Sequence, residues 1–427
     1  MRPIAEPDWA EAYRETAVRL RRVARESRLF LSGFCTCIDR LVTLEEAAAA
    51  LLASEDGDAA GLGRELLRRA EAGIGGEVRS ESRAARLLLE RIGGRAGLGG
   101  TAAQAAYALA QLGAPVLLAL EDRTAEQIAL LHPGILIATD AGLVRAGELV
   151  PETAEGKPAH VIVEYLAGRA VAGIVPRRTT RVIVRFADDG MDHDARFVAA
   201  SRRLASEAAG AIFAGFNAIP GGERDATLAR AAAIAGSWLA GGLALVHLEL
   251  GDFPNPDDRP AVLAGLAGSF TSLGMSLSEL GALLPGDAPV RDKARDVAEM
   301  LGVERVSIHA DDWALAVTRG DPWRERQALL TGCLLAASRA AAGRPVVPEA
   351  LPPGVRFHLP HPAFAEADGW YDVSCPAPWL ERPASTIGLG DTFVAGTMLV
   401  LGRARDEQRS SQSSPFETRA RDRRRSV

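Results

Sequence analysis

Short apolar runs alternate with amphipathic runs rich in alanine and leucine along most of this chain. The apolar runs end near a glycine or a polar residue and predict buried strands at 29–34, 116–120, 211–216, 243–252, 268–273 and 305–309. The amphipathic runs predict helices within 8–26, 43–73, 81–92, 101–112, 324–341 and 392–401. Alternation of this kind is typical of an α/β protein.

A different pattern occupies the middle of the chain. Residues 160–165 and 180–185 are rich in β-branched side chains and flank a turn that contains the basic pair Arg177-Arg178. Short β-rich pieces within an α/β alternation predict a separate small sheet.

Length and composition describe an ordinary globular protein. The 427 residues exceed what one small core needs, and 48% hydrophobic with 24% charged residues is typical of soluble chains. A net charge of −6 argues against a nucleic-acid-binding surface. No apolar run reaches the ~18 residues of a membrane span, and the first residues lack a signal-peptide core, so we expect a cytoplasmic protein. Residues 406–427 have few apolar anchors and are predicted to be disordered.

Cysteine usage excludes a disulfide scaffold, since the chain has only 4 Cys. Cys35 and Cys37 stand in C-x-C spacing, but no other Cys or His lies near them in the sequence. The lack of further ligands nearby in the sequence therefore disfavours a zinc site.

The most informative stretch is the loop 382–391, which precedes the last predicted helix. Gly388 and Gly390 allow a tight turn and a close approach of the backbone to a ligand. The N–H groups at the start of the helix would then bind an anion such as phosphate. Asp391 would repel that anion, so we interpret it as a base for an attacking hydroxyl; the alternative is an ordinary N-cap.

Other polar residues follow predicted strands, where open α/β sheets bind ligands. Asp39 comes after the first strand and could bind a ligand or cap the next helix. His247 and Glu249 share one face of a strand, where two such side chains are costly unless they are used or paired. Ser276 and Glu279 form a capping-box pattern.

A glycine-rich segment, Gly97-x-Gly99-x-x-Ala102, partly matches a dinucleotide-binding fingerprint. That motif requires a strand immediately before it, whereas residues 81–92 have a helical pattern. We therefore do not interpret it as a dinucleotide site.

The GxGD sequence Gly388-Leu389-Gly390-Asp391 resembles the signature of the ribokinase superfamily. With the preceding residues 381–386 it is similar, more narrowly, to the ADP-dependent glucokinase and phosphofructokinase family. The resemblance covers residues 28–403 and implies a ribokinase-like three-layer αβα domain with a small β-rich lid. It implies a large domain built from residues 1–40, 96–150 and 191–405, a lid built from 41–95 and 151–190, and a tail at 406–427.

The resemblance also implies a Mg²⁺-dependent sugar kinase that transfers a phosphoryl group from ADP to a hexose hydroxyl, of glucose or of fructose 6-phosphate. Asp391 is then the general base, and the backbone of Gly388, Leu389 and Gly390 binds the transferring phosphoryl group. The implied Mg²⁺ residues are Glu249 and Glu279. The implied sugar residues are Asp39, Glu77, Gly100, Thr101 and His160.

Some positions have a second interpretation. Glu77 could be a surface glutamate, and a single histidine before a strand, such as His160, could be structural. Cys35 and Cys37 stand where the family carries Asn in its sugar motif, which leaves the acceptor open. Ser276 stands where the family carries Asn in its metal motif, which leaves the geometry of the metal site open. The alternatives are a ribokinase-like kinase with another acceptor or donor, and a binding protein that has lost catalysis.

Overall fold

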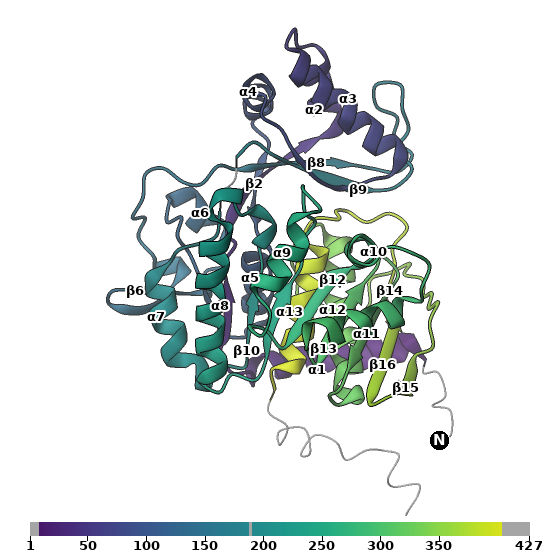
Figure 1. The fold of residues 1–427 in the computed structure, drawn as a ribbon. Helices are drawn as coiled ribbons and strands as arrows, with labels where there is room; N and C mark the ends of the chain where they lie inside the picture. The colour runs from purple at the N-terminus through teal and green to yellow at the C-terminus, as the bar shows by residue number, and fades with distance from the viewer. Residues whose placement is uncertain (1–7, 188–189, 404–427) are drawn as a thin grey trace, which may run out of the picture.

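A computed structural model describes residues 8–187 and 190–403 of the chain, which form two sheets with helices around them (Figure 1). The large sheet has eleven strands in the spatial order β15 (Phe364–Ala367), β16 (Trp370–Pro376), β14 (Trp313–Thr318), β13 (Arg305–His309), β12 (Ser272–Ser276), β11 (Val246–Glu249), β10 (Gly210–Phe213), β1 (Phe30–Gly33), β5 (Val116–Leu118), β6 (Leu136–Thr139) and β7 (Gly142–Arg145). The small sheet has five strands in the order β3 (Gly76–Arg79), β9 (Thr180–Arg185), β8 (His160–Tyr165), β2 (Cys37–Thr43) and β4 (Arg95–Gly99).

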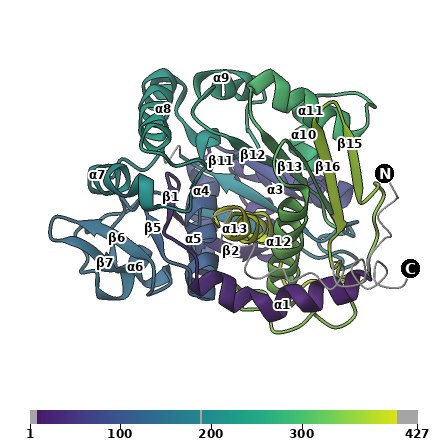
Figure 2. The same cartoon turned by 90° about the horizontal axis from the view of Figure 1, so that it is seen from below.

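Helices cover both faces of the large sheet, as the view from below shows (Figure 2). The helices of the described residues are α1 (Trp9–Arg25), α2 (Leu44–Leu52), α3 (Gly57–Ala72), α4 (Arg83–Ile92), α5 (Thr101–Leu112), α6 (Ala125–Leu130), α7 (Ala195–Leu204), α8 (Arg224–Ala240), α9 (Asp258–Gly265), α10 (Leu277–Leu283), α11 (Val290–Leu301), α12 (Pro322–Ala342) and α13 (Leu389–Leu401). Helices α1, α5, α12 and α13 lie on one face, and α7, α8, α9 and α11 on the other. The predicted three-layer α/β class is confirmed.

The burial of both faces explains the unbroken apolar runs in the sequence. Consecutive residues of a strand point to opposite faces of a sheet. In β10, Ala211 and Phe213 join the core under α8 and α9, whereas Ile212 joins the core under α5 and α13. Strands β6, β5, β1, β10, β11, β12 and β13 all run parallel. Such interior strands must be apolar on both sides.

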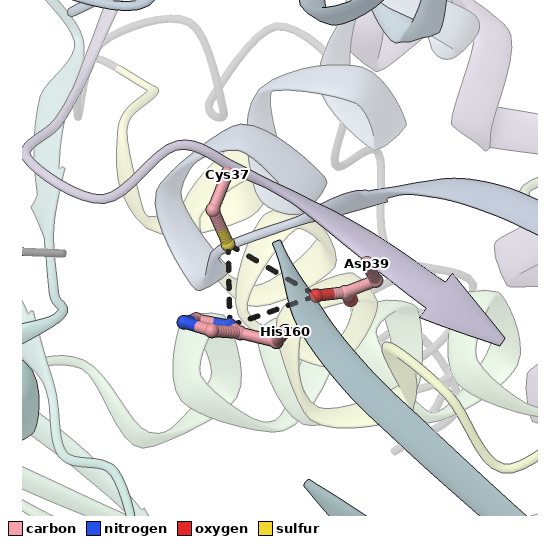
Figure 3. A group of neighbouring side chains, drawn as sticks. All are labelled: Cys37, Asp39 and His160. Atoms are coloured by element: carbon pink, nitrogen blue, oxygen red, sulfur yellow. Dashed lines mark hydrogen bonds and ion pairs between the residues drawn. The ribbon is translucent and has the colours of Figure 1, made fainter. Parts of the chain in front are cut away.

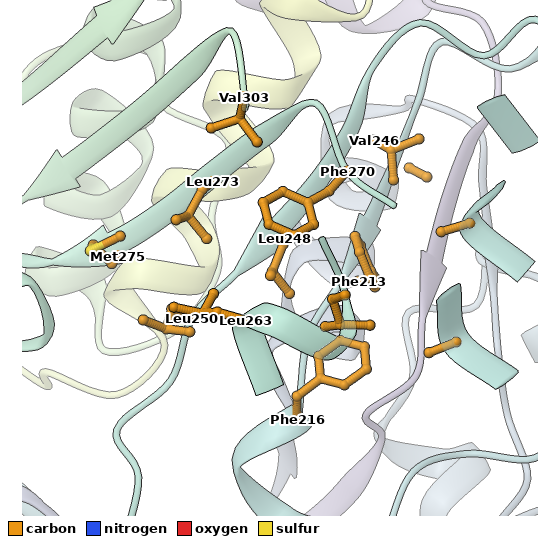
Figure 4. Close-up of a cluster of buried hydrophobic side chains, with 14 of the residues drawn as sticks. Phe213, Phe216, Val246, Leu248, Leu250, Leu263, Phe270, Leu273, Met275 and Val303 are labelled. Carbon is orange, nitrogen blue, oxygen red and sulfur yellow. The ribbon is translucent and has the colours of Figure 1, made fainter. Parts of the chain in front are cut away.

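Figure 4 shows the centre of the first of these cores. Phe213 of β10, Leu248 of β11 and Leu273 of β12 lie beside one another on neighbouring strands. Leu263 of α9 and Phe270, in the segment between α9 and β12, pack on this layer. Interlocked side chains of this size hold the strand ends in register, and the polar residues at those ends are positioned with them.

The small sheet lies above one end of the large sheet in Figure 1 and is covered by α2, α3 and α4. Strands β8 and β9 have the predicted bounds and pair antiparallel. Strands β2 and β4 cross the boundaries that we placed at residues 40/41 and 95/96, because β2 pairs with β4 along Cys37–Leu41 and Arg95–Gly99. The division into a large domain and a lid otherwise stays a prediction.

Several local predictions were wrong. The predicted helix 43–73 is two helices, because Asp56 caps a new helix by accepting from the N–H of Ala59. The glycine-rich segment before α5 contains a strand, β4, that was not predicted. The strand expected at 268–273 lies at Ser272–Ser276, after a turn in which Gly268 has a positive φ of 75°.

The predicted disorder at 406–427 lies outside the described residues. Among the described residues, every helix is too short or too polar to cross a bilayer.

Candidate active site

The carboxyl ends of three adjacent parallel strands bring the candidate residues together. Glu249 ends β11. Ser276 ends β12, the next strand of the sheet, and His309 ends β13, the strand after that. Ser276 pairs with His309 across β12 and β13. The edge of an open α/β sheet where strand ends meet is the usual place of a ligand site.

A buried chain of hydrogen bonds orients Glu249. Arg305, which forms a buried ion pair with Glu325, donates to the hydroxyl of Ser272 at 2.9 Å. That hydroxyl lies 2.8 Å from Nδ1 of His247, and Nε2 of His247 lies 3.0 Å from Glu249. Because the hydroxyl accepts from Arg305, we assign it as the donor to Nδ1, so Nε2 carries the proton that is donated to Glu249. The predicted pairing of His247 and Glu249 is therefore present.

His309 contacts the other oxygen of Glu249, at 3.4 Å. Burial alone would raise the pKa of Glu249, but the hydrogen bonds from His247 and His309 outweigh it and lower that pKa. Burial would also lower the pKa of His309, yet the neighbouring carboxylates of Glu249 and Glu279 raise it. The charged forms of both Glu249 and His309 are therefore favoured at this strand end.

Glu279 stands in the first turn of α10. Its carboxylate accepts from the N–H of Ser276 at 2.7 Å, and the Ser276 hydroxyl accepts from the N–H of Glu279 at 3.2 Å, so the predicted capping box is confirmed. Burial raises the pKa of Glu279 to about 7, with a further contribution from Glu249. A cation near the two carboxylates would stabilise their ionised forms.

The predicted anion-binding turn lies at the start of α13. Gly388 is the N-cap, with a positive φ of 69°, and the first helical bond runs from the N–H of Thr392 to the carbonyl of Gly388. The N–H groups of Leu389, Gly390 and Asp391 precede that bond and have no partner within the helix. Helix α13 thus begins three residues earlier than predicted. Asp391 lies in its first turn, so the N-cap alternative for Asp391 was wrong.

Arg339 and Thr101 are polar neighbours of Asp391, and both affect the pKa of its carboxyl. Burial raises the pKa of its carboxyl, while the positive charge of Arg339 and a hydrogen bond from Thr101 act to lower it. Arg339, on α12, is only 6% exposed and donates to Thr392 at 2.9 Å and to Gln104 at 2.8 Å. A Cβ on Gly388 would lie 2.3 Å from this guanidinium, so glycine there allows Arg339 to reach the turn.

The other candidate residues lie on and beside the small sheet. Asp39 is within β2, where it pairs with His160 of β8, and Thr43 caps the next helix. The capping alternative for Asp39 was therefore wrong. Cys37, Asp39 and His160 are all buried, and their side chains point toward one another (Figure 3).

Gly100 separates β4 from α5 and has a positive φ of 86°. A Cβ there would lie 2.4 Å from the carbonyl oxygen of Cys35, so only glycine fits between the two segments. Thr101 begins α5 and faces Asp391. Thr101 therefore connects the small-sheet residues to the start of α13.

Glu77 is not a surface residue, and that alternative was wrong. Its side chain is 7% exposed, forms an ion pair with Arg185 at 2.7 Å and accepts from Asn217 at 3.0 Å. Burial raises the pKa of Glu77, and Arg185 and His160 partly offset this effect. Asn217 also donates to the carbonyl of Asp252, so it bridges Glu77 of β3 and the loop after β11 of the large sheet.

A second contact joins the two sheets beside the GxGD turn. Glu164 of β8 accepts from the hydroxyl of Ser385 at 3.0 Å and from the N–H of Thr386 at 2.9 Å. Arg178 and Asp311 form a further ion pair across the same gap at 2.6 Å. The small sheet is thus held over the strand ends.

Four residues of this arrangement were not predicted from the sequence: Glu164, Asn217, His309 and Arg339. Of these, only Arg339 could have been recognised in the sequence, because it is a charged residue within the apolar run that forms the second half of α12. An arginine in such a run must be paired or used.

The family profile described as ADP-specific Phosphofructokinase/Glucokinase conserved region matches residues 61–400. The chain belongs to the ADP-specific phosphofructokinase/glucokinase family. As a member of this family it is a phosphotransferase with an alcohol group as acceptor. None of the curated proteins that were compared matches it.

Solved structures of the same fold include a kinase described as an ADP-dependent kinase in complex with fructose 6-phosphate and ADPβS. It has a TM-score of 0.78 at 18% identity, over 94% of this chain and 100% of the other. A hypothetical ADP-dependent phosphofructokinase from Pyrococcus horikoshii OT3 has a TM-score of 0.71 at 18% identity, over 90% and 99%. The last common ancestor of ADP-dependent phosphofructokinases from Methanosarcinales has a TM-score of 0.70 at 18% identity, over 93% and 99%. The ribokinase-like fold is thereby confirmed.

Proposed function

We propose that this protein transfers the terminal phosphoryl group of ADP to a hydroxyl of a hexose, with Asp391 as the general base. The observation that carries the proposal is the first turn of α13, where the half-buried carboxyl of Asp391 stands among N–H groups that have no partner within the helix. ADP as the donor follows from the family and from the ADP analogue bound by the similar kinase.

In the proposed reaction, Asp391 takes the proton of the attacking hydroxyl. The hydroxyl oxygen bonds to the terminal phosphorus, the bond from that phosphorus to the bridging oxygen breaks, and AMP leaves. The N–H groups of Gly388, Leu389 and Gly390 were predicted to bind the transferring group. With α13 beginning at Leu389, the N–H of Asp391 joins this set. Fixed N–H groups stabilise the charge without reorganising during the reaction.

Glu249 and Glu279 fit a Mg²⁺ site. Mg²⁺ takes oxygen ligands and usually binds through one or two carboxylates. Glu249 ends β11 and Glu279 lies in the first turn of α10, and desolvation raises the pKa of Glu279 to about 7, so a cation bound there would stabilise its ionised form. When bound there, Mg²⁺ would neutralise charge on the phosphate oxygens. His247 and His309 keep Glu249 ionised and oriented.

The acceptor would lie between the small sheet and α13, with Asp39, Gly100, Thr101 and His160 around it. Glu77 favours glucose, because a carboxylate next to this space would repel a 6-phosphate. Fructose 6-phosphate is the second candidate. Arg185 compensates the charge of Glu77, and the similar kinase binds that sugar phosphate.

A coupled phosphorylation assay with Mg²⁺ tests the proposal by crossing ADP and ATP with glucose and fructose 6-phosphate. We expect turnover with ADP and not with ATP, and a higher kcat/KM for glucose than for fructose 6-phosphate. Nucleotide binding without turnover on any sugar would instead support the binding-protein alternative.

The Glu77→Ala variant tests the choice of acceptor. It removes a carboxylate and leaves the charge of Arg185 in place, so we expect kcat/KM for glucose to fall about 10-fold or more, the loss of one hydrogen bond to a charged group. The activity with fructose 6-phosphate should fall less or rise. The matched control is Glu81→Ala, an exposed glutamate of the same segment, 78% exposed. An equal fall for both sugars would remove Glu77 from the choice of acceptor.

A further inference from the structure

Three buried side chains of different chemistry meet at the junction of β2 and β8 (Figure 3). Cys37 and Asp39 are two residues apart on β2 and therefore point to the same face. His160 is the first residue of β8 and is paired in register with Asp39. Sγ of Cys37 lies 3.5 Å from Nδ1 of His160 and 4.0 Å from Oδ1 of Asp39, and those two atoms are 3.7 Å apart.

These separations resemble those of a tetrahedral zinc site. Zinc bonds of about 2.0–2.3 Å at tetrahedral angles place ligand atoms about 3.3–3.6 Å from one another. The three atoms of this cluster would need to move by only a few tenths of an ångström. Thiolate, imidazole and carboxylate are also the three ligand types that zinc accepts in proteins.

The charge of the cluster supports the same conclusion. When bound to a metal, Cys37 as a thiolate and Asp39 as a carboxylate would carry two negative charges, which one divalent cation balances. Buried charges of this kind are costly unless they are paired or bind a metal. Cys37, Asp39 and His160 are 1%, 7% and 5% exposed, so a cation bound among them would be largely enclosed by the protein.

The neighbouring strand leaves room at the cluster. Gly99 of β4 is paired with Cys37. A Cβ on Gly99 would lie 2.4 Å from Oδ1 of Asp39 and 2.6 Å from Sγ of Cys37. Any other residue at this position would push the two ligand atoms apart.

We propose that Cys37, Asp39 and His160 bind one zinc-like divalent cation, with a fourth position open to water or another oxygen ligand. The sequence disfavoured zinc at Cys35 and Cys37 because no histidine is near them in the chain. In the fold, His160 supplies the missing ligand from 123 residues away. The site is separate from the carboxylates Glu249 and Glu279, which suit Mg²⁺, because a thiolate selects softer metals than Mg²⁺.

The proposal rests on ligand geometry and does not depend on the assigned reaction. Two of its ligands, Asp39 and His160, are also proposed to contact the acceptor. A bound cation would therefore occupy part of that space, and its binding must be measured without substrate and without a catalytic readout.

The test is a titration of the metal-free full-length protein with Co²⁺, in excess Mg²⁺ and a non-chelating reductant. We expect one Co²⁺ per chain, an intense thiolate-to-cobalt band in the near ultraviolet, visible bands of tetrahedral strength, and displacement by one equivalent of Zn²⁺. The Cys37→Ser variant should lose the thiolate band and bind Zn²⁺ at least about 100-fold more weakly, the upper range for outer-shell changes.

Two further variants keep the test decisive. Cys35→Ser removes the neighbouring buried cysteine, which is outside the cluster, and should keep both the band and the affinity. Asp39→Asn removes one charged ligand but no thiol, so it should retain the band and weaken Zn²⁺ binding at least about tenfold. Circular dichroism checks that each variant is folded. A wild-type protein without the thiolate band, or a band that disappears with Cys35 and not with Cys37, would overturn the proposal.

Discussion

Replacement of Asp391 by Asn is expected to reduce kcat/KM by about 10²- to 10⁴-fold, the usual contribution of a positioned general base. The amide cannot take the proton of the attacking hydroxyl. ADP should bind as well as before or more tightly, because the carboxylate that repels phosphate is gone. The coupled assay measures the first effect and calorimetric titration with ADP measures the second.

The pH profile separates a base from a structural carboxylate. Burial raises the pKa of Asp391, and the base works only when it is ionised. The wild-type kcat/KM should therefore fall as the pH decreases through a value above the ordinary pKa of Asp, about 3.9. The Asn variant should lack this acid limb. The control is Asp287→Asn, an exposed aspartate after α10. Wild-type turnover in Asp391→Asn would exclude the proposed role.

Replacement of Arg339 by Met is expected to reduce kcat/KM by about 10²- to 10³-fold, as when one donor of a preorganised charge-stabilising site is removed. The guanidinium lies against Gly388 and donates to Thr392, so it supplies positive charge at the start of α13 and fixes that turn. Met retains the length and the apolar contacts of the side chain within α12. Arg339→Lys keeps the charge without the two-sided hydrogen bonding and should lose less activity.

A second measurement shows whether Arg339 acts on Asp391 through its charge. The positive charge of Arg339 lowers the pKa of Asp391. Without that charge the pKa rises further, so the acid limb of kcat/KM should move to higher pH in Arg339→Met. A purely structural role would reduce activity and leave the limb in place. Arg344→Met, an exposed arginine just after the same helix, is the matched control.

Several buried elements could be predicted from the sequence with their bounds. Strands β8 and β13 have the expected bounds, and α5 ends at Leu112 as expected. A strand between two helix layers must be apolar throughout, so its pattern shows even in a single sequence. The capping box of Ser276 and Glu279 was also predictable, since all of its atoms lie within four residues.

Elements that depend on a distant partner were predicted less well. β4 consists largely of glycine and small residues and forms only because β2 pairs with it. β12 begins at Ser272, where the chain reaches His247 of β11, and not at Gly268, where the apolar pattern starts. The start of α13 depends on Gly388, whose positive φ ends the loop earlier than the apolar pattern indicates.

The sequence by itself determined the α/β class, the GxGD turn and the polar residues at the strand ends, because each is encoded within a few neighbouring residues. The tertiary structure alone decided which distant groups meet. It placed Arg339 against Gly388, paired Glu77 with Arg185, and brought His160 to Cys37. These pairs are joined by strand pairing and helix packing across long stretches of chain. No local pattern of residues records such contacts, so neither the burial of Glu77 nor the proposed zinc site could be derived before the fold was known.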